Sequence, residues 1–155
     1  MSPFTHYKRV RSIDPQVVDN ATATSYVIDT LGTVETHFVF SIGTTDIAMT
    51  TLKVQESDSI TDATTLDTGA DITGLVLGTS VDPIDGTTSA LPSATDDGKA
   101  VAFSIKNQGR KRYLQVIAVA GNGTTGVALG CQAFQLLEEG PSTSAERGYL
   151  EHLTT

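Results

Sequence analysis

The feature that most constrains the fold of this sequence is a series of short runs rich in β-branched and aliphatic residues, each ended by residues that favour turns. The runs cover residues 25–29, 35–42, 48–56, 99–106, 111–120 and 126–137. Runs of this kind, bounded by Gly, Asn, Asp or Pro, are typical of β-strands. No stretch has the apolar periodicity of a long helix. The sequence therefore predicts an all-β fold, an antiparallel β-sandwich of the jelly-roll or Ig-like type.

The alternation of apolar and polar side chains predicts where several strands lie. Residues 99–106 alternate cleanly, which predicts an edge strand or a strand with one open face. In residues 48–56 the apolar side chains point one way, which predicts a half-buried strand. Residues 111–120 have apolar side chains on both faces and predict a central strand. Because residues 107–109 and 121–124 contain Asn and Gly, we expect tight hairpins there and a meander of the last three strands.

Three segments stand apart from these strands. Residues 1–20 have no sustained periodicity and predict an extended N-terminal arm that orders on a partner. Residues 21–138 form the predicted sandwich domain, which an acidic insertion interrupts at about residues 57–98. Residues 139–155 form a C-terminal tail, in which a capping box predicts a short helix that docks on another surface.

The acidic insertion lies in the stretch from Lys53 to Lys99, which contains no other Lys or Arg. Its acidic residues are Glu56, Asp58, Asp62, Asp67, Asp71, Asp82, Asp85, Asp96 and Asp97. A structureless loop of roughly forty residues is unusual in a compact domain. We therefore expect this segment to hold a hairpin or to lie on a partner, and residues 72–77 to form one more strand.

The insertion contains Asp67-Thr68-Gly69, a motif that resembles the active-site turn of retroviral-type aspartic proteases. In those enzymes two such aspartates share one proton. The residues before Asp67 are mostly polar here, whereas that family has an apolar strand at this place. The motif therefore favours a turn in which Asp67 accepts local backbone hydrogen bonds and Gly69 takes a positive φ. A protease site built on Asp67 is the alternative.

The other titratable residues predict neither a catalytic group nor a cofactor or metal site. No Asp-x-Asp-x-Asp-Gly calcium loop is present, and residues 82–86 and 96–98 are typical of β-turns; a structural calcium ion is the alternative. His37 is expected to be a packed or surface residue. Cys131 alternates with apolar neighbours, which predicts a small buried side chain, and a lone cysteine excludes an internal disulfide.

The charge of the chain bears on its partners. A net charge of −8 argues against nucleic acid, because phosphate binding needs a basic surface. The basic residues nevertheless form two clusters, Lys8, Arg9 and Arg11 near the N-terminus and Lys106, Arg110, Lys111 and Arg112 around Gly109. We expect these side chains to form salt bridges or to contact an acidic protein surface. The sequence has neither an apolar run of membrane-spanning length nor a signal-peptide pattern, so we expect synthesis in the host cytoplasm and no membrane contact.

Three blocks of the sequence resemble segments of small structural proteins of tailed bacteriophages. The blocks are TDIAMTTLKVQESD at residues 45–58, LPSATDDGK at residues 91–99 and GRKRYLQ at residues 109–115. Over residues 24–138 the chain is similar to head decoration, or cement, proteins, and residues 144–148 look similar too. Proteins of that family bind the outer capsid lattice and commonly form trimers.

The resemblance implies a non-enzymatic capsid decoration protein on the virion surface, with the major capsid protein as its partner and a homo-oligomer, with a trimer favoured, as its state. The predicted contact residues are Tyr7, Lys8, Arg9, Arg11, Arg110, Lys111, Arg112, Tyr149 and Leu150. Two alternatives stay open. One is the aspartic protease built on Asp67, and the other is a carbohydrate-binding domain of a phage tail or adhesin, for which the tyrosines would have to supply the aromatic platforms.

Overall fold

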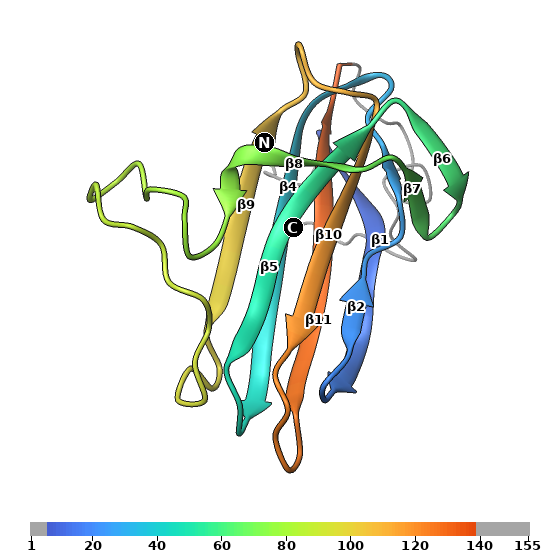
Figure 1. The fold of residues 1–155 in the computed structure, drawn as a ribbon. Coiled ribbons are helices and arrows are strands. Elements are labelled where there is room, and N and C mark those ends of the chain that lie inside the picture. Colours follow the sequence, from blue (N-terminus) through green and yellow to red (C-terminus); the bar gives the residue numbers. More distant parts are fainter. Residues whose placement is uncertain (1–5, 139–155) are drawn as a thin grey trace, which may run out of the picture.

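The computed structural model describes residues 6–138, which form a sandwich of two antiparallel sheets (Figure 1). The four-stranded sheet has the order β1 (Tyr7–Val18), β11 (Val127–Leu137), β4 (Thr33–Thr45) and β9 (Ala100–Lys106). The five-stranded sheet has the order β2 (Thr22–Thr24), β10 (Tyr113–Ala120), β5 (Met49–Ser57) and β8 (Ala70–Val76), and β3 (Ile28–Asp29) also pairs with β10. The predicted antiparallel β-sandwich is confirmed. No helix among these residues has the length and apolar character needed to cross a bilayer.

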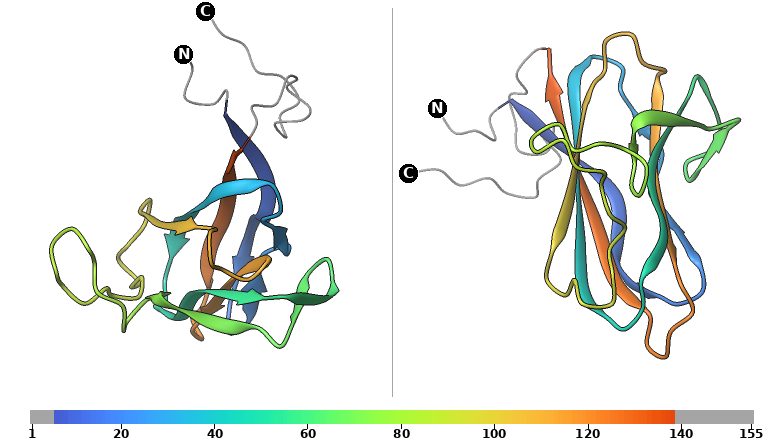
Figure 2. Two further views of the ribbon diagram at one scale, coloured as in Figure 1. Left: turned by 90° about the horizontal axis from the view of Figure 1, so that it is seen from above. Right: turned by 60° about the vertical axis from the view of Figure 1, so that its left-hand side comes forward.

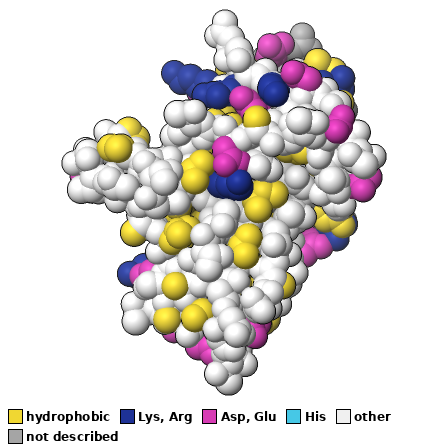
Figure 3. Space-filling model, viewed as in Figure 1, with side chains coloured by type: hydrophobic (Ala, Val, Ile, Leu, Met, Phe, Trp, Pro, Cys, Tyr) yellow, Lys and Arg dark blue, Asp and Glu magenta, His cyan; other side chains and the backbone are white. Residues whose placement is uncertain are grey.

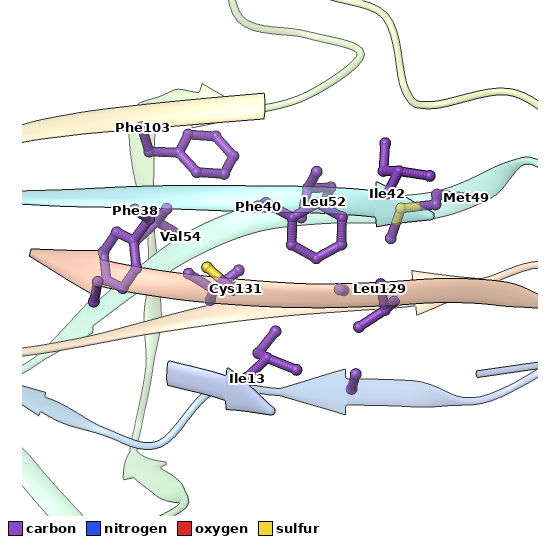
Figure 4. Packing of buried hydrophobic residues seen from close by; sticks show 14 of the residues in the cluster. Ile13, Phe38, Phe40, Ile42, Met49, Leu52, Val54, Phe103, Leu129 and Cys131 are labelled. Atoms are coloured by element: carbon purple, nitrogen blue, oxygen red, sulfur yellow. The ribbon is translucent and has the colours of Figure 1, made fainter. Parts of the chain in front are cut away.

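Alternate side chains of the long strands fill the space between the sheets (Figure 4). Phe38 and Phe40 of β4 and Leu52 and Val54 of β5 are fully buried. Burial of each such side chain stabilises the fold by about 1.5–3 kcal/mol. Cys131 is buried in the same cluster, as predicted, and its burial raises the pKa of the thiol to about 11. The thiol therefore stays protonated at neutral pH.

The positions that alternation predicts for three strands are confirmed. β9 is an edge strand of the four-stranded sheet, and β10 lies inside the five-stranded sheet. In β5, Leu52 and Val54 face the core, whereas Lys53 and Gln55 point outward. Period-two alternation reports the burial of each face of a strand, which is why it locates these strands correctly.

The expected meander of the last three strands is wrong. β9 and β11 belong to the four-stranded sheet, whereas β10 belongs to the five-stranded sheet. The connections over residues 107–112 and 121–126 therefore cross between the sheets. Glycines in the second connection allow close approach of other segments: a Cβ on Gly121 would lie 2.8 Å from the carbonyl oxygen of Ala48. An Asn-Gly pair is compatible with such a crossing as well as with a hairpin.

The predicted N-terminal arm is wrong over residues 7–18, which form β1. This strand pairs with β11 from its first residue to its last. Two register shifts interrupt the pairing, one on each side of Ile13, and Pro15 lies within the second. A bulge moves the following side chains relative to the two faces of the sheet, so the strand has no continuous alternation that the sequence could display. The predicted tail over residues 139–155 lies outside the described residues.

The acidic insertion is folded, and it contains the expected hairpin, formed by β6 (Ser59–Asp62) and β7 (Thr65–Asp67). The buried amide of Gln115 anchors this hairpin by donating a hydrogen bond of 2.6 Å to the carbonyl oxygen of Thr64. β8 pairs with β5 and confirms the strand expected near residues 72–77. Beyond β8, residues 78–89 project from the body of the sandwich (Figure 2).

Substitution of Gly126 tests how the connection over residues 121–126 crosses between the sheets. This residue has a φ of +88°, and a Cβ added to it would lie 2.5 Å from the carbonyl oxygen of Val18. Because both the backbone conformation and the space exclude a side chain, we expect Gly126→Ala to lower the free energy of unfolding by about 2–3 kcal/mol, measured by urea denaturation.

Gly130 supplies the matched control. It lies in β11, its φ is outside the left-handed region, and a Cβ there would make ordinary contacts of 3.5–3.7 Å with Pro15. Gly130→Ala is expected to leave stability unchanged or to raise it by up to about 1 kcal/mol. Equal losses for the two variants would contradict this account of the crossing.

Candidate functional site

The basic cluster near the N-terminus lies on β1. In the pairing with β11, Tyr7 lies opposite Leu136, and Arg9 lies opposite Phe134. Strand alternation therefore places Tyr7, Arg9 and Arg11 on the outer face of the four-stranded sheet, while the intervening Val10 packs against the core. Lys8 and Arg9 are exposed, and neither has an ion-pair partner within residues 6–138.

Aromatic and polar side chains continue this outer face onto β4 and β9. The rings of Tyr7 and His37 lie 5.8 Å apart in a tilted arrangement. His37 in turn hydrogen bonds to Ser104 through Nδ1 at 3.0 Å and to Glu35 through Nε2 at 3.2 Å. As expected, His37 is thus a packed surface residue, and it joins β1 to β9 across the sheet.

The second basic cluster lies in the loop between β9 and β10, and two of its arginines form ion pairs within the chain. Arg112 donates two hydrogen bonds to the carboxylate of Asp29, of 2.9 and 2.7 Å. Its guanidinium also lies 5.0 Å from the centre of the Tyr113 ring. Arg110 pairs with Glu56 at 3.5 Å, and the backbone N–H of Lys111 donates to the same carboxylate at 3.3 Å. These contacts fasten the loop to β3 and β5.

The two basic clusters lie at the same end of the four-stranded sheet, on its opposite edges. Tyr7, Leu136, Glu35 and Lys106 form one cross-strand row. Three strand spacings of about 4.8 Å put the ends of this row roughly 14 Å apart. We call this row, together with residues 107–112, the entry end. A group of Lys and Arg side chains is visible at the upper end of the molecule in Figure 3.

Arg11 and the tail residues do not join this group in the same way. Arg11 pairs with Asp14, and its guanidinium lies 4.2 Å from the centre of the Tyr26 ring. Tyr26 and Tyr113 therefore each have one ring face covered by an arginine of their own chain. Tyr149 and Leu150 lie outside the described residues.

A shallow groove of about 580 Å³ lies beside Arg9 and Arg11 on the outer face of the four-stranded sheet. It is lined by residues of β1, β4 and β11, and Gly43 and Gly130 are among them. The sequence analysis missed this groove because it depends on the bulged path of β1 over β11. Glycines inside two strands were the signal that could have pointed to it.

Asp67 ends β7 and is exposed. Its carboxylate accepts hydrogen bonds from the hydroxyls of Ser59 at 3.0 Å and Thr68 at 3.2 Å. The expected turn is present, but the residue with positive φ is Thr68, at 54°, and Gly69 does not adopt it. A Cβ on Gly69 would lie 3.0 Å from Oε1 of Gln55, so a larger residue here would crowd the Gln55 side chain of β5.

Most other aspartates of the insertion hold turns. The N–H of Gly86 donates to the carbonyl oxygen of Asp82 at 2.9 Å, and Gly98 has a φ of +73°, which confirms the two predicted turns. Within residues 6–138 no three side chains of His, Cys, Asp or Glu lie close enough to hold a metal ion.

Asp46, which the sequence analysis did not single out, organises the opposite end of the sandwich. Its carboxylate accepts three backbone N–H hydrogen bonds from Thr124, Thr125 and Gly126, of 2.9, 2.7 and 2.9 Å. These bonds, led by the one from Thr125, lower the pKa of Asp46. The partners are some eighty residues away in the sequence, so spacing could not reveal them.

Comparisons with known proteins give a structural neighbour of low similarity. No family model and no curated protein matches the sequence. A solved structure that resembles the chain is that of the SPBc2 prophage-derived protein YomS, with a TM-score of 0.47 and 8% sequence identity. The match covers 83% of this chain and 91% of that chain. The structural neighbour is thus a prophage-derived protein.

The carboxylates predict how stability depends on pH. The hydrogen bonds from Arg112 lower the pKa of Asp29, and backbone hydrogen bonds lower that of Asp46. The unfolded chain takes up protons near pH 4, whereas the folded chain keeps these groups ionised to lower pH. Their contribution is therefore complete above about pH 4 and is lost as the pH falls through the folded pKa values. We expect the free energy of unfolding, measured with urea, to fall steadily from pH 4 to pH 2.

Asp46→Asn should lower stability at pH 7 and make the acid-induced loss smaller, because one of the responsible carboxylates is gone. Glu138→Gln is the control, since the Glu138 side chain has no hydrogen-bond partner among the described residues. An acid-induced loss of the same size in Asp46→Asn and the unmodified protein would contradict the role assigned to Asp46.

Proposed function

We propose that this chain is a non-enzymatic structural protein of a phage virion that decorates the outer surface of the head. In this proposal it binds the major capsid protein, works as a homo-oligomer with a trimer favoured, and stabilises the capsid lattice. The sequence blocks that resemble cement proteins suggest this role, and the geometry of the entry end supports it.

The observation that carries the proposal is that the first and last described residues of the chain lie together at the entry end. The N–H of Leu137 donates to the carbonyl oxygen of His6 at 3.1 Å, beside the pairing of Tyr7 with Leu136. Residues 1–5 and 139–155 therefore continue from neighbouring points. Contacts from two segments and from the β1 side chains between them would bury more area on a capsid than the small body could alone.

The charges of the entry end fit an acidic partner surface. Lys8 and Arg9 are exposed and have no ion pair within residues 6–138, so they are available to a partner. Arg110 and Arg112 are used mainly to hold their own loop in place. The proposed capsid contacts are therefore Tyr7, Lys8 and Arg9, flanked by Arg11 and Lys111 and joined by Tyr149 and Leu150 of the tail.

Binding of this kind stabilises the lattice by mass action. A ligand that binds only the assembled lattice contributes about 4 kcal/mol per site when its free concentration is a thousand times its Kd. No catalytic step is needed for that effect. Many identical sites on a head then add up to a large resistance to heat and pressure.

The test is co-sedimentation of the purified protein with heads of the phage that encodes it, prepared without this protein. We expect saturable binding and heads that open at a higher temperature. Lys8→Glu combined with Arg9→Glu should weaken binding about tenfold or more, because the complementary charges are reversed.

Lys99→Glu is the control for charge reversal away from the entry end. Lys99 lies in the loop before β9, is 67% exposed and pairs with Asp96. This variant is expected to bind heads like the unmodified protein. Absence of head binding by the unmodified protein at low salt would contradict the proposal. An equal loss of head binding in both variants would show that the entry end is not the contact surface.

A further inference from the structure

The projecting loop of residues 78–89 is an arm built from its own hydrogen bonds. Gly78 N–H donates to the carbonyl oxygen of Ser89 at 3.1 Å, and Ser89 N–H donates to that of Ser80 at 2.8 Å. Farther out, Val81 and Thr88 form a β-bridge. The arm thus has a defined shape although the body of the sandwich does not cover it (Figures 1 and 2).

Two aspartates fix the tip of the arm. The carboxylate of Asp82 accepts the N–H of Ile84 at 2.7 Å, and that of Asp85 accepts the N–H of Thr87 at 2.8 Å. The tip so formed presents Ile84, which is 93% exposed, and Val81, which is 58% exposed. It combines an apolar centre with carboxylates on both sides.

No part of the described chain uses this tip. Ile84 is the most exposed of the large hydrophobic residues within residues 6–138, and neither Asp82 nor Asp85 has an ion pair there. Ordering a loop costs about 1–2 kcal/mol of backbone entropy per residue, and Ile84, at 93% exposed, offsets almost none of that cost by burial in its own chain. An apolar group presented on a preformed loop is the arrangement expected of a binding element.

A groove with complementary chemistry lies at the open side of the sandwich, between the edge strands β8 and β9. It has a volume of about 360 Å³. Leu75 is partly exposed and supplies its accessible apolar surface, whereas Ile72 and Ile105 lie beneath it in the buried core. Lys106 and Arg110 also line it, and Lys106 has no ion-pair partner among the described residues.

We propose that the arm tip of one copy binds in the β8–β9 groove of a second copy. Ile84 would lie against Leu75, and Asp82 and Asp85 would face Lys106 and Arg110. Arg110 keeps 38% of its side chain exposed although it pairs with Glu56 of its own chain. The occupant is a second copy because both halves of the contact, apolar and charged, are present on this chain. The inference adds the subunit contact to the homo-oligomer of the proposed function, but it does not depend on capsid binding.

Such a contact joins two different surfaces, so repeating it leads to a closed ring when the rotation between copies allows closure. Each copy then gives one arm and receives one arm. The contacts in a closed ring reinforce one another because the last one forms within an already linked assembly. A small contact is therefore sufficient for a stable ring.

The first test measures the oligomeric state of the full chain by sedimentation equilibrium. We expect a concentration-dependent oligomer, and we expect Ile84→Ser to weaken each subunit contact about 10- to 100-fold, the range that corresponds to loss of one buried aliphatic side chain. Leu31→Ser is the matched control, since Leu31 is 72% exposed but lies outside the arm and the groove, and it should leave the oligomer unchanged.

The second test traps the contact directly. A chain with Ile84→Cys is mixed under mild oxidation with a chain carrying Thr73→Cys, a residue that lines the groove. We expect a covalent heterodimer to form at least about ten times faster than in a control mixture in which the second chain carries Leu31→Cys in place of Thr73→Cys. The reason is that a disulfide requires Cα atoms within about 7 Å. The native Cys131 is buried and does not interfere.

A monomeric unmodified protein, an oligomer that survives Ile84→Ser, or equal trapping rates for Thr73→Cys and Leu31→Cys would each overturn the inference. Head binding separates it from the proposed function. A monomer that still binds heads would overturn the arm contact and the homo-oligomeric state but leave the capsid role standing. An arm-linked oligomer that does not bind heads would overturn the capsid role and leave the arm contact standing.

Discussion

The structure depends on the position of β11 between β1 and β4. This strand comes last in the described chain, yet it pairs along its length with the first strand on one side and with the longest strand on the other. Without it the four-stranded sheet would lose its middle, and the core around Phe38 and Phe40 would be open on one side. Because these pairings join distant parts of the sequence, the fold is of the kind that forms slowly, after the whole chain is available.

The position of β11 also determines where the candidate site lies. Its last residues lie beside the first residues of β1, so the chain enters and leaves the domain at the same end of one sheet. The exposed Lys8 and Arg9 are next to that point. The opposite end is held together differently, by Asp46 and the glycines of the crossing connection, and it consists of loops that are fastened to one another.

The parts of the fold that could be predicted are those in which a residue's neighbours along the chain determine its surroundings. Alternation located β5, β9 and β10 and identified Cys131 as buried, because a strand's faces are encoded residue by residue. Strand β1 was not predicted, because bulges around Ile13 interrupt its alternation of apolar and polar side chains. The placement of β10 in the other sheet was not predicted either. A turn that contains Gly shows that the chain bends there, but it does not show which strand the chain pairs with next.

The candidate site, like the fold, could be predicted from the sequence only where local patterns determine it. Composition and clustering were enough to identify Lys8, Arg9 and the Arg110 to Arg112 run as residues of interest. That Arg112 pairs with Asp29, 83 positions away, depends on the completed fold and is absent from local patterns. The aspartates of the insertion were correctly predicted to be turn residues at Asp82 and Asp96, but the positive φ lies at Thr68 and not at the predicted Gly69. Residue type alone favours glycine at such a position and did not predict the exception.

The bulged path of β1 has a consequence for how copies of this protein can associate. β1 is the outermost strand of its sheet, and a long regular edge strand is a template on which another chain can extend the sheet. Pro15 has no N–H to donate, and the register shifts around Ile13 interrupt the regular spacing of the backbone donors and acceptors of this strand. The interrupted edge therefore disfavours the joining of neighbouring molecules edge to edge into fibrils.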